Sequence, residues 1–228
     1  MTTLLQLADR CQLALNDSGV GTWPQATVEA WVLDAIRDYS QYFPRVRTST
    51  TTIETPGDTP HELDLPTDFL AMLLVEFPDG EDPPKYLDVK SRTRSGFWDC
   101  EGYYDIEPSH DAAAAGTLFL SEAPTAGEAY TLTWLATHDT NLDPGDTITV
   151  PEDHESILLL YVLWQACRER MATQQQDPDT TIHLLQQLVK ASEQSEAEYR
   201  RALQRAQSHV APGGWTGPWT ADVYDPIY

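Results

Sequence analysis

The segment P-E-D-H-E-S-I-L-L-L-Y-V-L-W-Q-A-C-R-E-R, residues 151–170, marks the point where the sequence changes from strand-like to helical patterning. Proline at a first helical position needs no hydrogen-bond donor, and the two acids after it suit the positive end of a helix dipole. We therefore expect a helix from Pro151 to about Thr173. From Ile157 to Ala166 this helix is apolar on nearly every side, which predicts burial on several sides.

A longer helix is expected on the C-terminal side of this segment. A polar loop at residues 174–179 separates the two, and the last helix should span about Thr180–Ser208. Its other faces carry Gln, Glu and Arg, so its apolar stripe is narrow and resembles that of a coiled coil. The stripe consists of Ile182, Leu185, Leu188, Val189, Ser192, Tyr199, Leu203 and Ala206.

Two more helices are expected near the N-terminus, at residues 2–16 and about 25–42, with Pro44 ending the second. Between the second and third helices the period changes to two, which indicates strands. The expected strands are residues 47–55, 72–77, 86–89, 103–107, 117–120 and 129–135.

These elements predict an α+β fold that is mainly α. We expect a four-helix bundle with a mainly antiparallel β module inserted between helices two and three, followed by an extended C-terminal arm. The predicted domains are 1–46 and 151–210 for the two helical hairpins, 47–150 for the β insert and 211–228 for the arm.

The arm reads A-P-G-G-W-T-G-P-W-T-A-D-V-Y-D-P-I-Y and combines helix-breaking residues with many aromatic ones. Solvated, disordered termini are normally poor in aromatic residues, so this arm is expected to dock. It could pack on its own domain, or it could reach another subunit or protein, which we favour. The expected anchors are Trp215, Trp219, Val223, Tyr224, Ile227 and Tyr228.

The chain of 228 residues has a net charge of -22, with 14 basic residues against 36 acidic ones. Such a surface repels nucleic acid. The charge fits either of two explanations: a host with high internal salt, or a surface that must not bind a polyanion passing close by. The longest apolar run, Ile157–Leu163, is too short for a membrane span. The first ten residues lack the basic region of a signal peptide, so we expect use without secretion and no membrane partner.

No pattern of catalytic or metal-binding residues emerges from the sequence. Residues 139–143 begin like a calcium loop, but Pro144 stands where glycine is needed and Val150 where a glutamate is needed. The six histidines and three cysteines lack ligand spacing, and the common nucleophile and phosphate-loop signatures are missing. We therefore expect no enzyme activity, no metal and no cofactor.

Three stretches in order resemble one protein family. They are W-V-L-D-A-I-R-D-Y-S-Q-Y-F-P at residues 31–44, H-E-L-D-L-P-T-D-F-L-A-M-L-L-V-E-F at 61–77, and the hairpin from Leu118 that leads into the helix after Pro151. Together they resemble the head-to-tail connector, or adaptor, proteins of tailed viruses, over about residues 2–208. The strong negative charge departs from the family pattern and fits a halophilic host or another host with an acidic proteome.

The resemblance implies a structural protein of the virion neck, assembled in the host cytoplasm. It implies a ring of copies of this chain, usually twelve, with the C-terminal arm extended toward the portal protein above. A further neck or tail protein would bind below, and double-stranded DNA would pass through a negatively charged channel without specific binding.

A different class of function remains open from the residues alone. A monomeric ligand-binding module could carry its site on the β insert, lined by the aromatic residues Trp98, Tyr103 and Tyr104. The basic stretch K-S-R-T-R, residues 90–94, could likewise be a solvated edge or a contact for an acidic partner or DNA.

Overall fold

The computed structural model describes residues 2–17, 23–53, 61–109, 116–176 and 182–209. These residues form an α+β fold with four α-helices and two β-sheets, as the sequence predicted. The contacts divide the chain into two units, which are described separately. Residues 1–36 and 140–228 make up the helical unit, and residues 37–139 make up the β unit.

Four helices and a short 3-10 turn were found in the described residues. The α-helices are α1 (Leu4–Asp17), α2 (Gln25–Tyr42), α3 (Glu155–Gln175) and α4 (Ile182–His209), and the 3-10 turn is Glu152–His154. The unit boundary falls within α2, after Ile36. The predicted helix at Pro151 therefore begins with one 3-10 turn, with His154 as the N-cap residue of α3.

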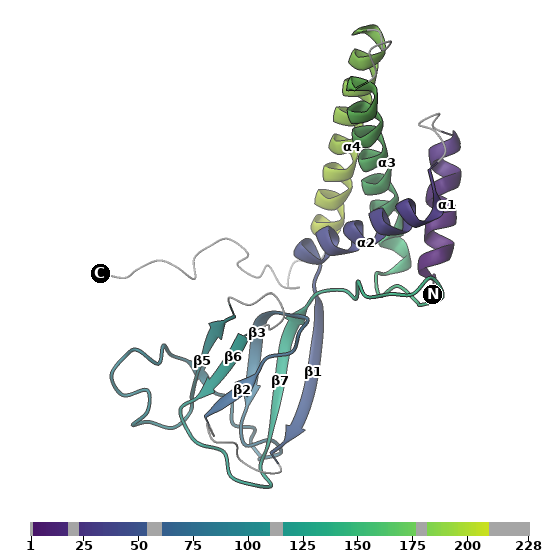
Figure 1. Cartoon of the computed structure of the whole chain (residues 1–228). Coiled ribbons are helices and arrows are strands. Elements are labelled where there is room, and N and C mark those ends of the chain that lie inside the picture. Colours follow the sequence, from purple (N-terminus) through teal and green to yellow (C-terminus); the bar gives the residue numbers. More distant parts are fainter. Residues whose placement is uncertain (1, 18–22, 54–60, 110–115, 177–181, 210–228) are drawn as a thin grey trace. The chain divides into compact units, whose positions relative to one another are not determined.

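In the helical unit α3 lies between α1 and α4, and the part of α2 up to Ile36 runs across them (Figure 1). Helices α3 and α4 are antiparallel, and the rings of Tyr161 and Tyr199 meet with centroids 5.4 Å apart. The N-terminus is tied to the segment before α3, because Leu4 donates its backbone N–H to the carbonyl of Asp146. This bond fixes the start of α1 beside the start of α3.

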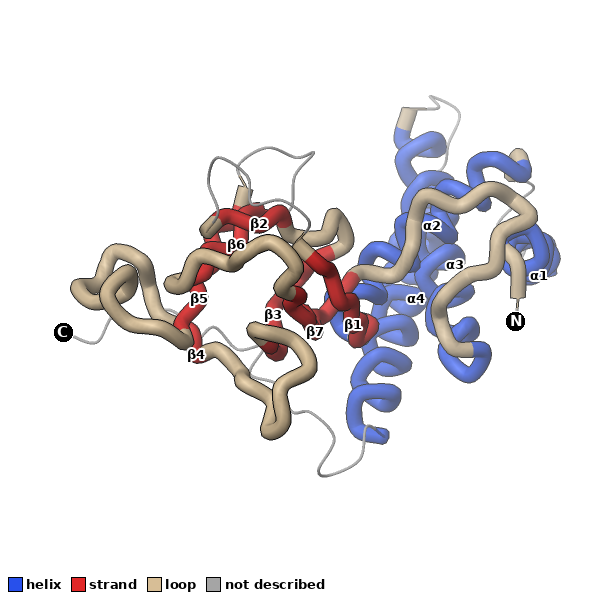
Figure 2. Tube along the Cα trace, turned by 90° about the horizontal axis from the view of Figure 1, so that it is seen from below, coloured by secondary structure: helices blue, strands red, loops and turns tan. Residues whose placement is uncertain are grey.

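The β unit holds two sheets around one apolar core (Figure 2). The first has the order β1 (Arg45–Thr52), β7 (Ala129–Ala136), β3 (Phe69–Glu76). The second has the order β2 (Glu62–Asp64), β6 (Gly116–Leu120), β5 (Tyr103–Pro108), β4 (Asp88–Val89). Alternate residues of both sheets point into the core, which includes Val75, Tyr104, Leu118, Leu120, Tyr130, Leu132 and Trp134.

The pairing agrees with an antiparallel module except at one place. β4 pairs in parallel with β5, whereas the other neighbouring strands are antiparallel. The expected strand at residues 86–89 is reduced to Asp88–Val89, because Tyr86 makes an isolated bridge to Glu76 of β3. The chain thus leaves one sheet at Tyr86 and joins the other at Asp88.

The apolar stripe of α4 is buried only in part. Ser192, Tyr199 and Leu203 are buried, but the side chain of Ile182 is 76% exposed. The register that places Tyr199 against Tyr161 carries the first turn of α4 past Gln175, the last residue of α3. The first residue of the predicted stripe, Ile182, is for this reason not buried within one chain.

Candidate functional site

The residues predicted to bind a partner lie in the C-terminal arm. Trp215, Trp219, Val223, Tyr224, Ile227 and Tyr228 all fall outside the described residues. Their docking role therefore stays a prediction. The surfaces that can be described belong to the helical unit and to the β unit.

A partly exposed apolar surface of the helical unit lies on α3. Leu158 and Val162 are fully buried, yet other large apolar side chains of the helix are only half-buried. These half-buried side chains are Leu159, Leu160, Tyr161, Leu163 and Trp164. Leucine and tryptophan side chains that stay partly in water lose part of the free energy that full burial would supply. The prediction of burial on several sides is therefore met only partly within one chain.

An aromatic cluster connects this surface to α4. The Tyr199 ring packs edge-on against Tyr161 and stacks with Trp164 at a centroid distance of 6.2 Å. The guanidinium carbon of Arg168 lies 5.2 Å from the centre of a Trp164 ring. Aromatic rings and Arg are the residue types that dominate binding energy at protein interfaces. Tyr199 is buried, so Trp164 and Arg168 are the members of the cluster that are candidate contacts for another chain.

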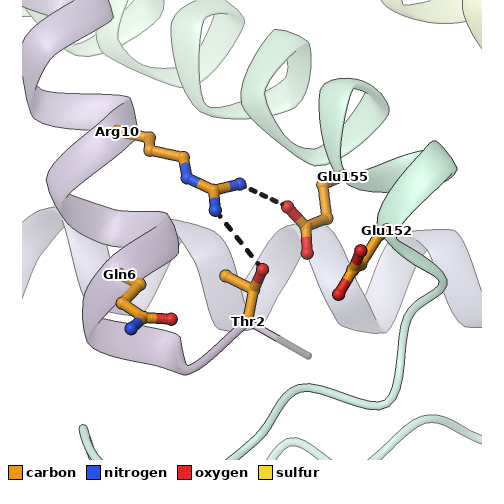
Figure 3. Close-up of a pocket in the computed structure, with 5 residues that line it drawn as sticks. All are labelled: Thr2, Gln6, Arg10, Glu152 and Glu155. Atoms are coloured by element: carbon orange, nitrogen blue, oxygen red, sulfur yellow. Dashed lines mark hydrogen bonds and ion pairs between the residues drawn. The ribbon is translucent and has the colours of Figure 1, made fainter.

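A polar pocket lies between α1 and the start of α3, with a volume of about 410 Å³ (Figure 3). Thr2, Gln6, Arg10, Glu152 and Glu155 line it. Nη1 of Arg10 donates to Oε2 of Glu155 at 2.6 Å, and its Nη2 lies 3.5 Å from the hydroxyl of Thr2. The ion pair joins α1 to α3 across one wall of the pocket.

Glu155 is the unusual member of this pocket. It is buried, with 6% of its surface exposed, and its second oxygen, Oε1, has no hydrogen-bond partner. Figure 3 shows the carboxylate of Glu155 directed toward Thr2 and Glu152. Burying a polar atom without a hydrogen-bond partner costs about 1–3 kcal/mol of folding free energy. A hydrogen-bond donor next to this oxygen would therefore stabilise the protein.

The aromatic residues of the β unit do not share one site. Tyr104 is buried in the core, where burial and then the charge of Asp88 raise the pKa of its hydroxyl. Tyr103 precedes it on β5 and so points to the opposite face of the sheet, where Nζ of Lys90 lies 4.3 Å from its ring centre. Trp98 is half-exposed and packs edge-on against Phe97 and His61. Tyr103 and Tyr104 therefore cannot line the same binding site.

The basic stretch at residues 90–94 forms a loop after β4, and acidic side chains next to this loop bind part of the stretch. Arg92 pairs with Glu107 and stacks over the ring of Phe119 at 3.8 Å, and its backbone N–H donates to Asp105. Lys90 donates to the carbonyl of Gly96. Arg94 is exposed. The three cations are therefore not presented together on one strand face.

The described residues contain no group of three or more His, Cys, Asp or Glu placed to hold a metal ion. None of their helices has the length and hydropathy that a bilayer span requires. All three cysteines are free, and burial raises the pKa of the Cys11 thiol to about 12 and also raises that of Cys167.

Sequence reasoning missed the pocket and its ion pair. Arg10 and Glu155 are 145 residues apart, and neither belongs to a recognisable motif. The one local signal is that Glu155 stands two residues before the apolar run of α3. A carboxylate there is next to residues that the fold must bury.

Comparisons with known proteins add to these observations. No curated protein matches the chain. A family model described as SU10 adaptor protein matches residues 2–222, which is nearly the whole sequence and includes most of the arm. This match confirms the family that the ordered motifs predicted. The chain belongs to the SU10 adaptor protein family, a family of phage head-to-tail adaptors.

Proposed function

We propose that this chain, as a structural adaptor at the head–tail junction of a phage, works as a ring of identical subunits. The ring has twelve copies and docks on the portal protein through the arm at residues 211–228. A further neck or tail protein binds on its other side, and DNA passes through its channel. In each subunit the four helices form one bundle, and residues 47–150 form an insert between the second and third helices.

The observation that carries the ring is the half-buried apolar surface of α3. α1 and α4 already pack on this helix, yet Leu159, Leu163 and Trp164 keep part of their surface in water. A neighbouring subunit would bury these side chains. Contacts between different faces of identical subunits close into a ring when the rotation between neighbours allows it.

The arm supplies the contact with the portal in this proposal. Each buried Trp or Tyr contributes about 1.5–3 kcal/mol before the cost of ordering the arm is subtracted. One arm alone would therefore bind modestly. Many arms on one ring, each with its own site on the portal, would bind far more tightly because the second and later contacts are intramolecular.

The charge suits a passage for DNA. With a net charge of -22 per chain, a ring surrounds the duplex with like charge. Tight nucleic-acid binding depends on Lys and Arg that neutralise phosphates, and this chain has only 14 such residues. DNA would slide through such a channel without being held.

Co-sedimentation with the portal ring encoded in the same genome tests this proposal. The full chain is compared with a chain that ends at Ala211, and with a full-length chain in which Trp215, Trp219 and Tyr224 are replaced by Ser. Portal-dependent sedimentation of the full chain that both variants lose is the expected result. The substituted chain has the same length as the full chain. It therefore separates the loss of the aromatic side chains from the loss of the arm itself.

Two other outcomes would change the proposal. If both variants sediment with the portal as well as the full chain does, the arm is not the anchor and the contact moves to the helices. If the full chain does not sediment with the portal at low or at high salt, the ring-and-portal assignment is wrong.

A further inference from the structure

Two of the half-buried apolar side chains of α3 lie on the side of the helix that faces away from α1. Glu155 faces α1, because its carboxylate pairs with Arg10. Leu160 and Trp164 follow Glu155 by five and nine residues, which places them about 140° and 180° around the helix from it. Both are half-buried. A second chain that covers them must therefore approach the helical unit from the side opposite α1.

Two exposed leucines of α1 face away from the core of the helical unit. Leu5 and Leu13 each lie two residues, or about 200° around the helix, from a leucine that is buried, Leu7 or Leu15. Leu13 is the more exposed of the two, at 65%. Among the described residues of the helical unit, the large apolar side chains that are exposed are Leu5, Leu13, Ile182 and Val189.

Leu13 lies at nearly the same height as Leu160. Helices α1 and α3 run in the same direction, and the ion pair places Arg10 beside Glu155 (Figure 1). Leu13 is three residues on from Arg10, or about 4.5 Å further along α1. Leu160 is five residues on from Glu155, or about 7.5 Å further along α3. The two leucines are therefore on opposite sides of the helical unit at one level.

The exposed apolar side chains of α4 lie at a different height. Tyr199 of α4 meets Tyr161 of α3, and the two helices run in opposite directions. Val189 and Ile182 therefore lie about 15 Å and 26 Å beyond Tyr161. In a ring whose axis runs along α3, neighbouring copies are related by a rotation without a shift along the helices. Leu13 of a second copy can then reach Leu160, whereas Val189 and Ile182 cannot.

The charges on the two sides are complementary. Asp9 lies one turn before Leu13, is exposed, and contacts the neutral amide of Gln25. Helix α4 lies on the side of α3 opposite α1, and its Arg205 is exposed and has no ion-pair partner in the described part of the chain. The antiparallel pairing of α3 and α4 places Arg205 level with Glu155, which is also the level of Asp9. A second copy that brings Leu13 to Leu160 would therefore bring a carboxylate to a guanidinium.

We propose that the outer face of α1 in one copy packs on the side of α3 opposite α1 in the next copy. Leu13 lies against Leu160 and Trp164 of that copy, and Asp9 lies beside its Arg205. The contact joins two different faces of the same chain, so it repeats from copy to copy and closes into a ring. The inference rests on the proposed ring and names the partner of the α3 surface.

A carboxylate at position 13 tests the contact. Leu13→Asp is expected to lower the amount of chain bound per portal ring roughly tenfold or more at a fixed concentration, because a charge would be buried against Leu160 and Trp164. The matched control is Ile182→Asp, the same change at a position that is 76% exposed and lies outside the contact. This control should bind the portal like the unchanged chain. Circular dichroism checks that both variants fold.

Disulfide cross-linking tests whether the two faces touch. Cys100, the exposed cysteine, is first replaced by Ser, and the other two cysteines are buried. The variant Leu13→Cys/Leu160→Cys, bound to the portal ring and oxidised, should give disulfide-linked dimers and larger multimers on a non-reducing gel. The control Ile182→Cys/Leu160→Cys should give single chains under the same conditions.

The outcomes separate this contact from the ring itself. If Leu13→Asp binds the portal like Ile182→Asp, or if Leu13→Cys/Leu160→Cys gives only single chains, this contact is overturned while the ring proposal stands. If the unchanged chain fails to sediment with the portal, both proposals are wrong.

Discussion

Replacing Arg10 with Gln is expected to destabilise the helical unit by about 2 kcal/mol. Arg10 and Glu155 approach to 2.6 Å, with side chains 56% and 8% exposed. Removing one partner from a fully buried pair costs about 3–5 kcal/mol, whereas an exposed pair contributes at most about 1 kcal/mol. This pair falls between the two cases, because the carboxylate is buried and the guanidinium is not. Without Arg10, Oε2 of Glu155 would lose its hydrogen-bond partner as well, which would leave the buried carboxylate without either bond.

The measurement is urea denaturation of the full chain, followed by circular dichroism at the helix band, since most of the helical residues belong to the helical unit. Glu155→Gln is the companion variant, because the amide keeps the shape of the side chain and removes the charge. The double variant Arg10→Gln/Glu155→Gln should lose less free energy than the sum of the two single variants. A loss below about 0.5 kcal/mol for Arg10→Gln, or strict additivity, would refute the reasoning.

Three further predictions concern the β unit and the thiols. Gly116 has a φ of +133°, and a Cβ there would collide with the backbone carbonyl of Glu107. Gly116→Ala should therefore lower the free energy of unfolding by more than about 1 kcal/mol. The control is Gly127→Ala, where a Cβ meets only open space, and it should lose less in the same denaturation assay. In a thiol titration of the folded chain, Cys100 should react with a disulfide reagent at once, while Cys11 and Cys167 should react only on unfolding. Fast reaction of all three thiols in the native chain would contradict the burial of Cys11 and Cys167. Folding raises the pKa of the Cys11 thiol to about 12, so protonation of this thiol stabilises the folded state. That contribution to the free energy of unfolding is complete below about pH 9 and falls as the pH rises toward 12. Denaturation at pH 8 and at pH 10 would detect the difference.

Helical periodicity gave the four helices to within a few residues. The observed α1, α2 and α4 begin or end within about three residues of the predicted bounds. Such patterns are local, because each depends on side chains three or four positions apart on one helix. The hairpin expected from Leu118 was wrong, because β6 and β7 belong to different sheets: β6 pairs with β2 and β5, and β7 pairs with β1 and β3.

Pairings between distant residues could not be predicted. The parallel contact of β4 with β5 depends on the route of the chain after Tyr86, and no local pattern encodes it. The ion pair of Arg10 with Glu155 depends on α1 packing beside the first turn of α3. The exposure of Ile182 depends on the relative lengths of α3 and α4. Each of these features is a property of two segments together.

The candidate site divides in the same way. The aromatic arm could be proposed from composition alone, and the match to the family includes residues 211–222 of it. The pocket, in contrast, combines residues from the N-terminus and from the middle of the chain. Tyr103 and Tyr104, which looked like parts of one site in the sequence, were separated by the alternation of β5, and Trp98 lies outside that strand.

The distribution of the thiols makes the subunit number measurable. Cys100 is exposed in the β unit, while Cys11 and Cys167 are buried. A maleimide dye added to the native protein would therefore attach once per chain, without any substitution. On single portal-bound particles, each chain would then contribute one photobleaching step, so the number of steps would count the copies directly.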